Sequence, residues 1–166
     1  MPDRFSEGEI KGVEVRKLKR FFDDRGWLTE LFRKDDLGEE FLPAMSYISS
    51  TNPGVTRGPH EHRDQADFFC FIGPSNFKLR VWDNRKDSET FGSMMTMVVG
   101  QDNPASVLIP AGVVHGYRNV GDIDGIVINC PNRLYAGAGR KEEVDEIRHE
   151  DDGESTFRMD DWESSL

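Results

Sequence analysis

The fold is decided by two short stretches of sequence, PAGVVHGYRN at residues 110–119 and GVTRGPHEH at residues 54–62. Side chains on a β-strand alternate between its two faces, so His60 and His62 project to the same side if their stretch is a strand. His115 joins them if the other stretch is a neighbouring strand. The two stretches therefore predict a group of imidazoles inside a β-barrel. The alternative is that these histidines only hydrogen-bond within a polar interior.

The remaining segments are short and are separated by Gly, Pro, Asn and Asp, which is typical of an all-β sandwich or barrel. At residues 77–81 apolar and charged residues alternate, which indicates one buried and one solvated face. We expect strands at residues 10–18, 26–33, 44–50, 66–72, 76–83, 93–99, 106–109, 113–119 and 123–130. Residues 35–41 predict a single helical turn or short helix, residues 131–139 an irregular loop, and residues 141–152 either helix or extended tail.

Composition favours one globular domain. The chain has 166 residues, enough for a real core and too few to require a second domain. It has no apolar run of membrane-spanning length and does not begin like a signal peptide, so we expect a cytoplasmic protein that does not contact a membrane. Cys70 and Cys130 stand alone in apolar stretches, which predicts buried thiols rather than a disulfide or a zinc cluster.

The net charge of −10 is concentrated near the C-terminus. Residues 141–166 contain eleven of the 31 acidic residues but only three of the 21 basic ones, so the rest of the chain is close to neutral. Binding to nucleic acid is disfavoured, because it depends on clustered Lys and Arg that neutralise phosphates. We interpret the acidic tail as a solvated extension.

The two histidine stretches, about fifty residues apart, resemble the two motifs of the cupin fold. Four segments also occur in the order found in the dTDP-4-dehydrorhamnose 3,5-epimerase family of cupins: residues 23–30 (DDRGWLTE), 54–60 (GVTRGPH), 88–92 (SETFG) and 109–116 (IPAGVVHG). The chain resembles this family over roughly residues 15–130. The resemblance implies an all-β, cupin-type jelly-roll barrel in a single domain, residues 1–166. The barrel would occupy about 10–130, with an irregular loop and the acidic tail at 131–166.

The resemblance implies an isomerase that acts on a nucleotide-linked, probably dTDP-linked, 4-keto-6-deoxysugar in polysaccharide or glycoside biosynthesis. A ketone acidifies the protons on its neighbouring carbons, so a base can remove one and an acid can return it to the opposite face. The intermediate enolate must be stabilised by donors or positive charge. Under this interpretation the protein needs no cofactor. A homodimer with exchanged N-terminal strands is also implied.

The resemblance assigns roles to individual residues. His60 matches the base. The residues expected to bind substrate are Arg25, Glu30, Arg57, His62, His115 and Asn119, with Arg25 and Glu30 reaching the nucleotide across the dimer. Arg25 has a simpler interpretation as a residue of its own turn, and Arg57 as a residue at a strand end.

Three positions depart from the family pattern. Asp67 stands where the family has a lysine, Ile128 aligns with the catalytic tyrosine, and the aspartate that orients the family's histidine has no clear counterpart in the tail. Tyr117 is the nearest substitute acid, because it shares a strand face with His115. Tyr135 in the following loop is the second candidate.

The same departures suit other activities. His60, His62, Asp67 and His115 fit the ligand set of metal-binding cupins and suit Fe(II), Mn(II), Ni(II) or Zn(II). Alternatively, Asp67 faces solvent or orients His62. A histidine that gives its lone pair to a metal cannot also take a proton from carbon, so His60 cannot be ligand and base at once. Two further alternatives are a sugar-nucleotide 3,4-ketoisomerase and a non-catalytic cupin that binds a sugar nucleotide.

Overall fold

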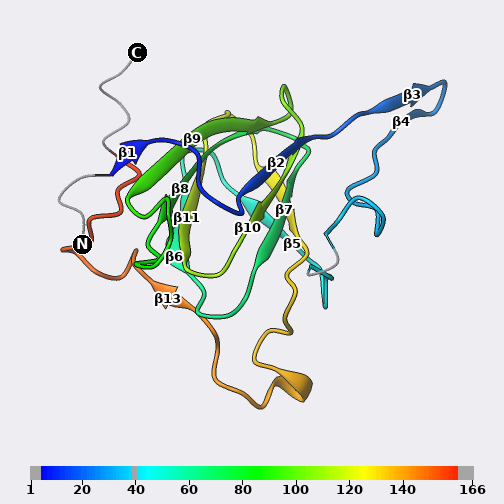
Figure 1. Ribbon diagram of the computed structural model, residues 1–166. Helices are drawn as coiled ribbons and strands as arrows, with labels where there is room; N and C mark the ends of the chain where they lie inside the picture. Colours follow the sequence, from blue (N-terminus) through cyan, green and yellow to red (C-terminus); the bar gives the residue numbers. More distant parts are fainter. Residues whose placement is uncertain (1–4, 39–40, 161–166) are drawn as a thin grey trace.

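The computed structural model describes residues 5–38 and 41–160, and it confirms the all-β jelly-roll expectation (Figure 1). One sheet has the strand order β1-β9-β8-β11-β6-β13 and the other has the order β2-β10-β7-β12-β5. The first sheet comprises β1 (Ser6–Glu7), β9 (Ser93–Gly100), β8 (Asn76–Asp83), β11 (Val113–Asn119), β6 (Thr56–Glu61) and β13 (Ile147–Arg148). The second comprises β2 (Glu14–Lys17), β10 (Ala105–Ile109), β7 (Asp67–Phe71), β12 (Gly125–Asn129) and β5 (Tyr47–Thr51).

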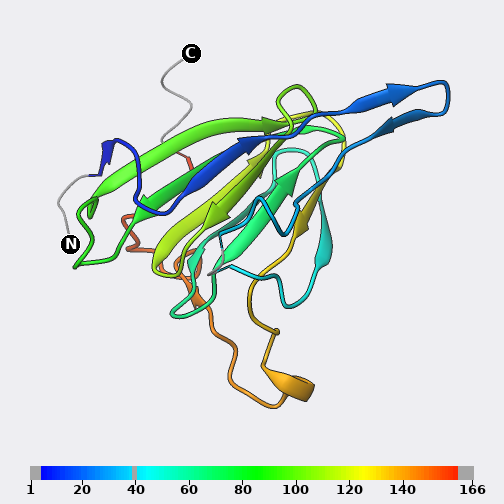
Figure 2. The ribbon, with the colours of Figure 1, turned by 45° about the vertical axis from the view of Figure 1, so that its right-hand side comes forward.

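Two further strands, β3 (Phe21–Asp23) and β4 (Gly26–Leu28), pair as a hairpin that extends away from the barrel (Figure 2). Helical structure within the described ranges is limited to the 3-10 turn η1 (Ala138–Arg140). Residues 5–38 and 41–160 contain no helix long and apolar enough to span a membrane.

The core lies between the inner faces of the two sheets. Along β8 the side chains of Phe77, Leu79 and Val81 are fully buried in it, as the alternating pattern predicts. They pack against Phe71 and Val127 of the other sheet. Burying each such side chain contributes about 1.5–3 kcal/mol, so this contact accounts for much of the barrel's stability.

Part of the outer face of each sheet is covered by a segment from outside the barrel. Leu37 and Phe41, from the segment that follows the hairpin, pack on Phe68 of β7. Phe157 and Met159, from the C-terminal tail, pack against the other sheet. The interpretation of the tail as a solvated extension was therefore wrong, because its few apolar residues cover a sheet face that would otherwise be exposed.

Two strands have the bounds that the sequence predicts. Strands β8 and β11 have the expected limits, and Cys70 and Cys130 are free, buried thiols. The long strand expected at 26–33 is only Gly26–Leu28, and β6 was absent from the expected strands. Near 35–41 there is a single hydrogen-bonded turn rather than a short helix, with Leu37 N donating to Arg33 O, and residues 39–40 are not among those that the structure describes. Beyond the loop, the 141–152 segment forms no helix and contributes the two-residue strand β13.

Candidate active site

One end of the barrel opens into a cavity of about 1190 Å³. Its walls come from residues 44–49, from residues 56–65 on and after β6, and from the irregular segment 131–150, with Phe69 and Tyr117 between them. The segment that follows the last barrel strand thus closes one side of the cavity. A space of this size accommodates a ligand larger than a simple monosaccharide.

Strands β6 and β11 bring His60 and His115 together. The two residues are paired in register, and their ring centroids lie 4.5 Å apart. This close approach depends on Gly58, whose φ is +79° and at which a Cβ atom would lie 2.6 Å from the carbonyl oxygen of His115. Glycine is therefore required here for both its backbone conformation and its lack of a side chain.

Asp67 opens β7 and projects into the barrel on the same face as Phe69 and Phe71, because side chains alternate along a strand. Only one oxygen of its carboxylate accepts hydrogen bonds from neighbouring side-chain amides. Oδ1 accepts hydrogen bonds from Gln65 Nε2 at 2.9 Å and from Asn129 Nδ2 at 2.8 Å. The other oxygen, Oδ2, is left to face the histidines.

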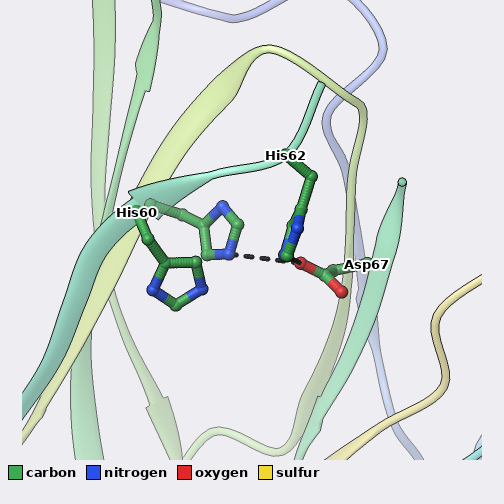
Figure 3. A group of neighbouring side chains, drawn as sticks. His60, His62 and Asp67 are labelled. Atoms are coloured by element: carbon green, nitrogen blue, oxygen red, sulfur yellow. Dashed lines mark ion pairs between the residues drawn. The ribbon is translucent and has the colours of Figure 1, made fainter. Parts of the chain in front are cut away.

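Two imidazoles converge on that oxygen. His62 Nε2 lies 3.2 Å from Asp67 Oδ2 and His115 Nε2 lies 3.3 Å from it (Figure 3). Burial by itself would raise the pKa of Asp67, but the adjacent His115 and His62 outweigh burial and hold that pKa far below its usual range. Asp67 and His115 are each only 1% exposed.

Backbone carbonyls fix the tautomers of both rings. The Nδ1 atom of His115 lies 3.1 Å from Val113 O, and Nδ1 of His62 is bonded to Asp145 O. A carbonyl oxygen can only accept a hydrogen bond, so each Nδ1 carries the proton and each neutral ring has its lone pair on Nε2. Burial lowers the pKa of His62, but Asp67 and the Asp145 carbonyl outweigh it, so that pKa is raised overall.

His60 is held differently. Among the described residues, its ring nitrogens have no hydrogen bond of the kind that orients His62 and His115. Burial, and then the neighbouring His115 and His62, lower the pKa of His60 to about 2. Its imidazole is therefore neutral at physiological pH, and it lines the cavity. In Figure 3 the His62 ring meets Asp67, whereas the His60 ring lies to one side.

Two tyrosine hydroxyls belong to the same region. Tyr117 OH lies 3.2 Å from Ser49 Oγ, and Tyr47 OH accepts a hydrogen bond from Asn129 Nδ2 at 3.0 Å. Burial raises the pKa of Tyr117, and it raises that of Tyr47 to about 12. Both phenols therefore keep their protons at neutral pH and line the cavity as potential donors. Sequence reasoning had not singled out Tyr47.

Arginine side chains line the cavity at several points. Arg57 is fixed by Thr51 Oγ1 at 2.8 Å and Ser50 O at 2.7 Å. Within the described ranges, the guanidinium groups of Arg63 and Arg140 make no ion pair, although both residues line the cavity. These two are therefore available to an anionic ligand, whereas Arg57 already has protein partners.

Other residues expected at the site lie elsewhere. Arg25 and Glu30 are on or just after the hairpin, where they pair with Asp23 and Arg33 rather than facing this chain's cavity. Asn119 is fully buried, and its amide braces loops through Thr51 O, Ile123 O and the backbone of Gly121. His115 lies behind the cavity wall and not on its surface. Tyr135 lines the cavity and is 59% exposed.

Asp145 is the part of the site that the sequence did not predict. Its carboxylate accepts hydrogen bonds from the backbone N–H groups of Arg63, Asp64 and Gln65 at 2.8, 2.9 and 2.8 Å. This turn positions both His62 and Gln65 beside Asp67. Asp145 therefore stabilises the site although it does not contact Asp67 itself. No local sequence pattern marks a side chain that binds a turn some eighty residues away.

Comparison with known proteins shows which family the chain resembles. The sequence profile of the dTDP-4-dehydrorhamnose 3,5-epimerase family matches residues 7–152. The chain is 41% identical over 128 residues to a probable low-salt glycan biosynthesis epimerase, Agl13, of Haloferax volcanii, which covers 76% of this chain and 81% of that one. It is 37% identical over 126 residues to the spore coat polysaccharide biosynthesis protein SpsL of Bacillus subtilis, covering 76% and 82%.

A solved structure gives the same fold. The crystal structure of a dTDP sugar isomerase from Desulfovibrio desulfuricans superposes with a TM-score of 0.77 at 20% identity, covering 90% of this chain and 91% of that one. Since the family profile spans nearly the whole described barrel, and since the histidine stretches lie at one cavity, the chain belongs to the dTDP-4-dehydrorhamnose 3,5-epimerase family.

Proposed function

We propose that the protein epimerises a nucleotide-linked 4-keto-6-deoxysugar by removing and returning a proton on a carbon beside the ketone. Family membership supports this reaction class. The relatives in Haloferax and Bacillus have names that link them to glycan or polysaccharide biosynthesis, which supports a role of that kind here. The proton transfers themselves require no cofactor, because the substrate's own ketone acidifies the neighbouring C–H bond.

The observation that carries the proposal is the position of His60. It is the histidine that lines the cavity without a hydrogen bond that commits its ring to the protein, so its lone pair is available to a substrate. Its neighbours His62 and His115 are each oriented by a carbonyl and by Asp67. We therefore assign the general base to His60 and a supporting role to the other two.

The proton donor is a tyrosine. Tyr117 projects from β11 between Phe69 and Phe71, and its hydroxyl reaches the cavity at Ser49. A phenol held in its protonated form can deliver a proton to the enolate face opposite the base. Tyr47 is the second candidate, and its hydrogen bond to Asn129 holds it in place.

The nucleotide diphosphate is assigned to Arg63 and Arg140, which line the cavity without protein ion pairs. Arginine suits phosphate because its planar group forms two parallel hydrogen bonds. We further propose a homodimer with exchanged N-terminal strands, in which Arg25 and Glu30 of one subunit meet the cavity of the other. The cytoplasm remains the expected compartment.

The test is solvent deuterium exchange. The protein is incubated in D₂O with a panel of dTDP-4-keto-6-deoxysugars, and deuterium at the carbons beside the ketone is followed by NMR. We expect incorporation and a change of configuration at one or both carbons. His60→Asn keeps the size of the side chain and should lower the rate by about 10²–10⁴-fold, the usual contribution of a general base, with little effect on dTDP binding.

A matched control is His149→Asn, because His149 lies outside the cavity and pairs with Glu61. This variant should exchange at the wild-type rate. If the wild-type protein binds the sugar nucleotides but incorporates no deuterium from any of them, the epimerase assignment is wrong and a binding protein remains. Configuration retained at carbon 5, with the carbonyl moved from carbon 4 to carbon 3, would instead identify a ketoisomerase.

A further inference from the structure

We propose that His62, Asp67 and His115 form a binding site for one divalent transition-metal ion, with His60 left outside the ligand set. Each of the three offers one atom to a common point. The ligand atoms of these residues and of His60 all lie within 4.8 Å of one another. The binding of the metal does not depend on the proposed reaction, and only its chemical role rests on that function.

The first argument is the mismatch of lone pairs. Both Nδ1 atoms face backbone carbonyls, so neutral His62 and His115 each direct a lone pair from Nε2 toward Asp67 Oδ2, which also has only lone pairs to offer. One proton placed among the three atoms can bridge only two of them. A cation with several coordination positions accepts all three lone pairs at once.

The second argument is that two of these atoms have no hydrogen-bond partner. Asp67 Oδ2 and His115 Nε2 are fully buried, and neither is hydrogen-bonded within the described part of the chain. Buried polar atoms are normally paired, so two unpaired atoms at one point require an explanation, and a bound ion supplies one. The third atom, His62 Nε2, has one contact besides Asp67, a Gln65 Nε2 donor at 3.2 Å. That amide supports an unprotonated His62 Nε2.

The third argument is distance and orientation. Bonds of about 2.0–2.2 Å from zinc to imidazole nitrogen or carboxylate oxygen place adjacent ligand atoms roughly 3.0–3.5 Å apart. The observed separations from Asp67 Oδ2 are 3.2 Å to His62 and 3.3 Å to His115. The carbonyls on both Nδ1 atoms, and the two donors on Asp67 Oδ1, are the supporting contacts that orient metal ligands in proteins.

His60 is excluded because, among the described residues, the Asp67 carboxylate pairs with His62 and His115 and not with His60. Two imidazoles and one carboxylate suit Zn²⁺, Fe²⁺ or Ni²⁺ and leave coordination positions open. An ion of charge +2 held by one carboxylate leaves a local charge of +1 directly behind the wall formed by His60 and His62. That charge would favour an enolate in the cavity, and His60 stays free to act as the base.

The test uses untagged protein dialysed against EDTA and then titrated with Zn²⁺ by calorimetry and with Co²⁺ by visible absorption, without substrate. We expect one equivalent of each metal to bind. His62→Ala, His115→Ala and Asp67→Asn should each weaken binding by at least about 100-fold, because loss of a ligand costs more than loss of its supporting partner. His60→Asn and the control His149→Asn should each retain one equivalent with little change in affinity.

Asp67→Asn distinguishes a lost ligand from a damaged fold. Its amide group can donate one N–H to His62 Nε2 and one to His115 Nε2, while its oxygen continues to accept from Gln65 and Asn129. We therefore expect the metal-free variant to melt no lower than the metal-free wild type. Zn²⁺ at about 100 times its Kd should raise the wild-type midpoint by about 5–10 °C and leave the variant unchanged.

Several outcomes would overturn the proposal. Wild-type protein that takes up neither Zn²⁺ nor Co²⁺ has no such site. Undiminished binding by Asp67→Asn places the metal elsewhere, and loss of binding in His60→Asn returns His60 to the ligand set. A marked fall in the melting temperature of metal-free Asp67→Asn would show a protonated histidine paired with the carboxylate. Metal binding without deuterium exchange would reject the proposed epimerisation only, so the two failures can be told apart.

Discussion

The β3–β4 hairpin and the C-terminal tail are each placed differently from what their composition predicts. The hairpin formed by β3 and β4 is rich in apolar residues, yet Phe22 and Leu28 are 73% and 63% exposed. The C-terminal tail is strongly acidic, yet its Phe157 is only 3% exposed and packs on Trp82. The hairpin extends from the barrel, whereas the tail runs back along it (Figure 2).

The comparison teaches that a few well-placed apolar residues determine where a segment lies, whatever its net charge. The apolar residues of the tail pack on the outer face of one sheet, and its Asp145 binds the backbone of the turn after β6. The hairpin has no such surface within its own chain. Its exposed aromatic side chains are therefore what the proposed second subunit would cover, because apolar groups gathered on a surface mark an interaction site.

The largest effect is expected at the tail's apolar anchor. Phe157→Ala removes a buried ring that contacts Phe5, Trp82 and His149, and truncation of a buried phenylalanine costs about 3–5 kcal/mol of unfolding free energy. Urea denaturation followed by circular dichroism measures this loss. A change below about 1 kcal/mol would show that the tail contributes little to the fold and would remove the contrast with the hairpin.

The next effect concerns the acidic group that links the tail to the site. Asp145→Ala leaves three backbone N–H groups without their acceptor, and because water replaces part of this bonding we expect a loss of about 2 kcal/mol. Deuterium exchange on the substrate should fall as well, because the turn positions His62 and Gln65. Denaturation and the exchange assay together check both effects.

The matched control for Asp145 is Asp151, an exposed acidic residue of the same tail that pairs with Arg148. An exposed ion pair contributes little, so Asp151→Ala should change stability by less than about 0.5 kcal/mol and leave exchange unaltered. Equal losses for the two variants would mean that the tail acts through its overall charge and not through one directed carboxylate.

These features differ in how far the sequence reveals them. Strands β8 and β11 were predicted with their observed limits, because apolar and charged residues alternate along β8 and because β11 coincides with the histidine stretch at 110–119. Strand β6 was absent from the expected strands, because Gly58 and Pro59 interrupt its pattern, although its histidines were singled out. Asp145 acts through backbone groups distant in sequence, and a side chain that binds a turn leaves no periodic signal.

A smaller effect is expected at the start of the C-terminal segment, where Arg140 lines the cavity without an ion pair. A hydrogen bond to a charged group contributes about 1.5–3 kcal/mol, so Arg140→Ala should raise the KM for a sugar nucleotide by about tenfold or more and leave kcat nearly unchanged. Lys141→Ala removes the same charge one residue on, outside the cavity lining, and should leave KM unaltered. Equal effects would point to the general charge of the loop.

The smallest effect on folding is expected at the hairpin. Phe22→Ser combined with Leu28→Ser removes two large apolar groups that already face solvent, so at dilutions where the chain is monomeric its unfolding free energy should change by less than about 0.5 kcal/mol. Association should suffer instead. Light scattering of the wild type should give roughly twice the 18.9 kDa of one chain, and the double variant should give the mass of one chain. A wild-type monomer at micromolar concentration would contradict the exchanged dimer, and Arg25 and Glu30 would then have no cavity of a second subunit to enter. A loss of stability in the double variant as large as that of Phe157→Ala would mean that the hairpin is part of the barrel's own fold.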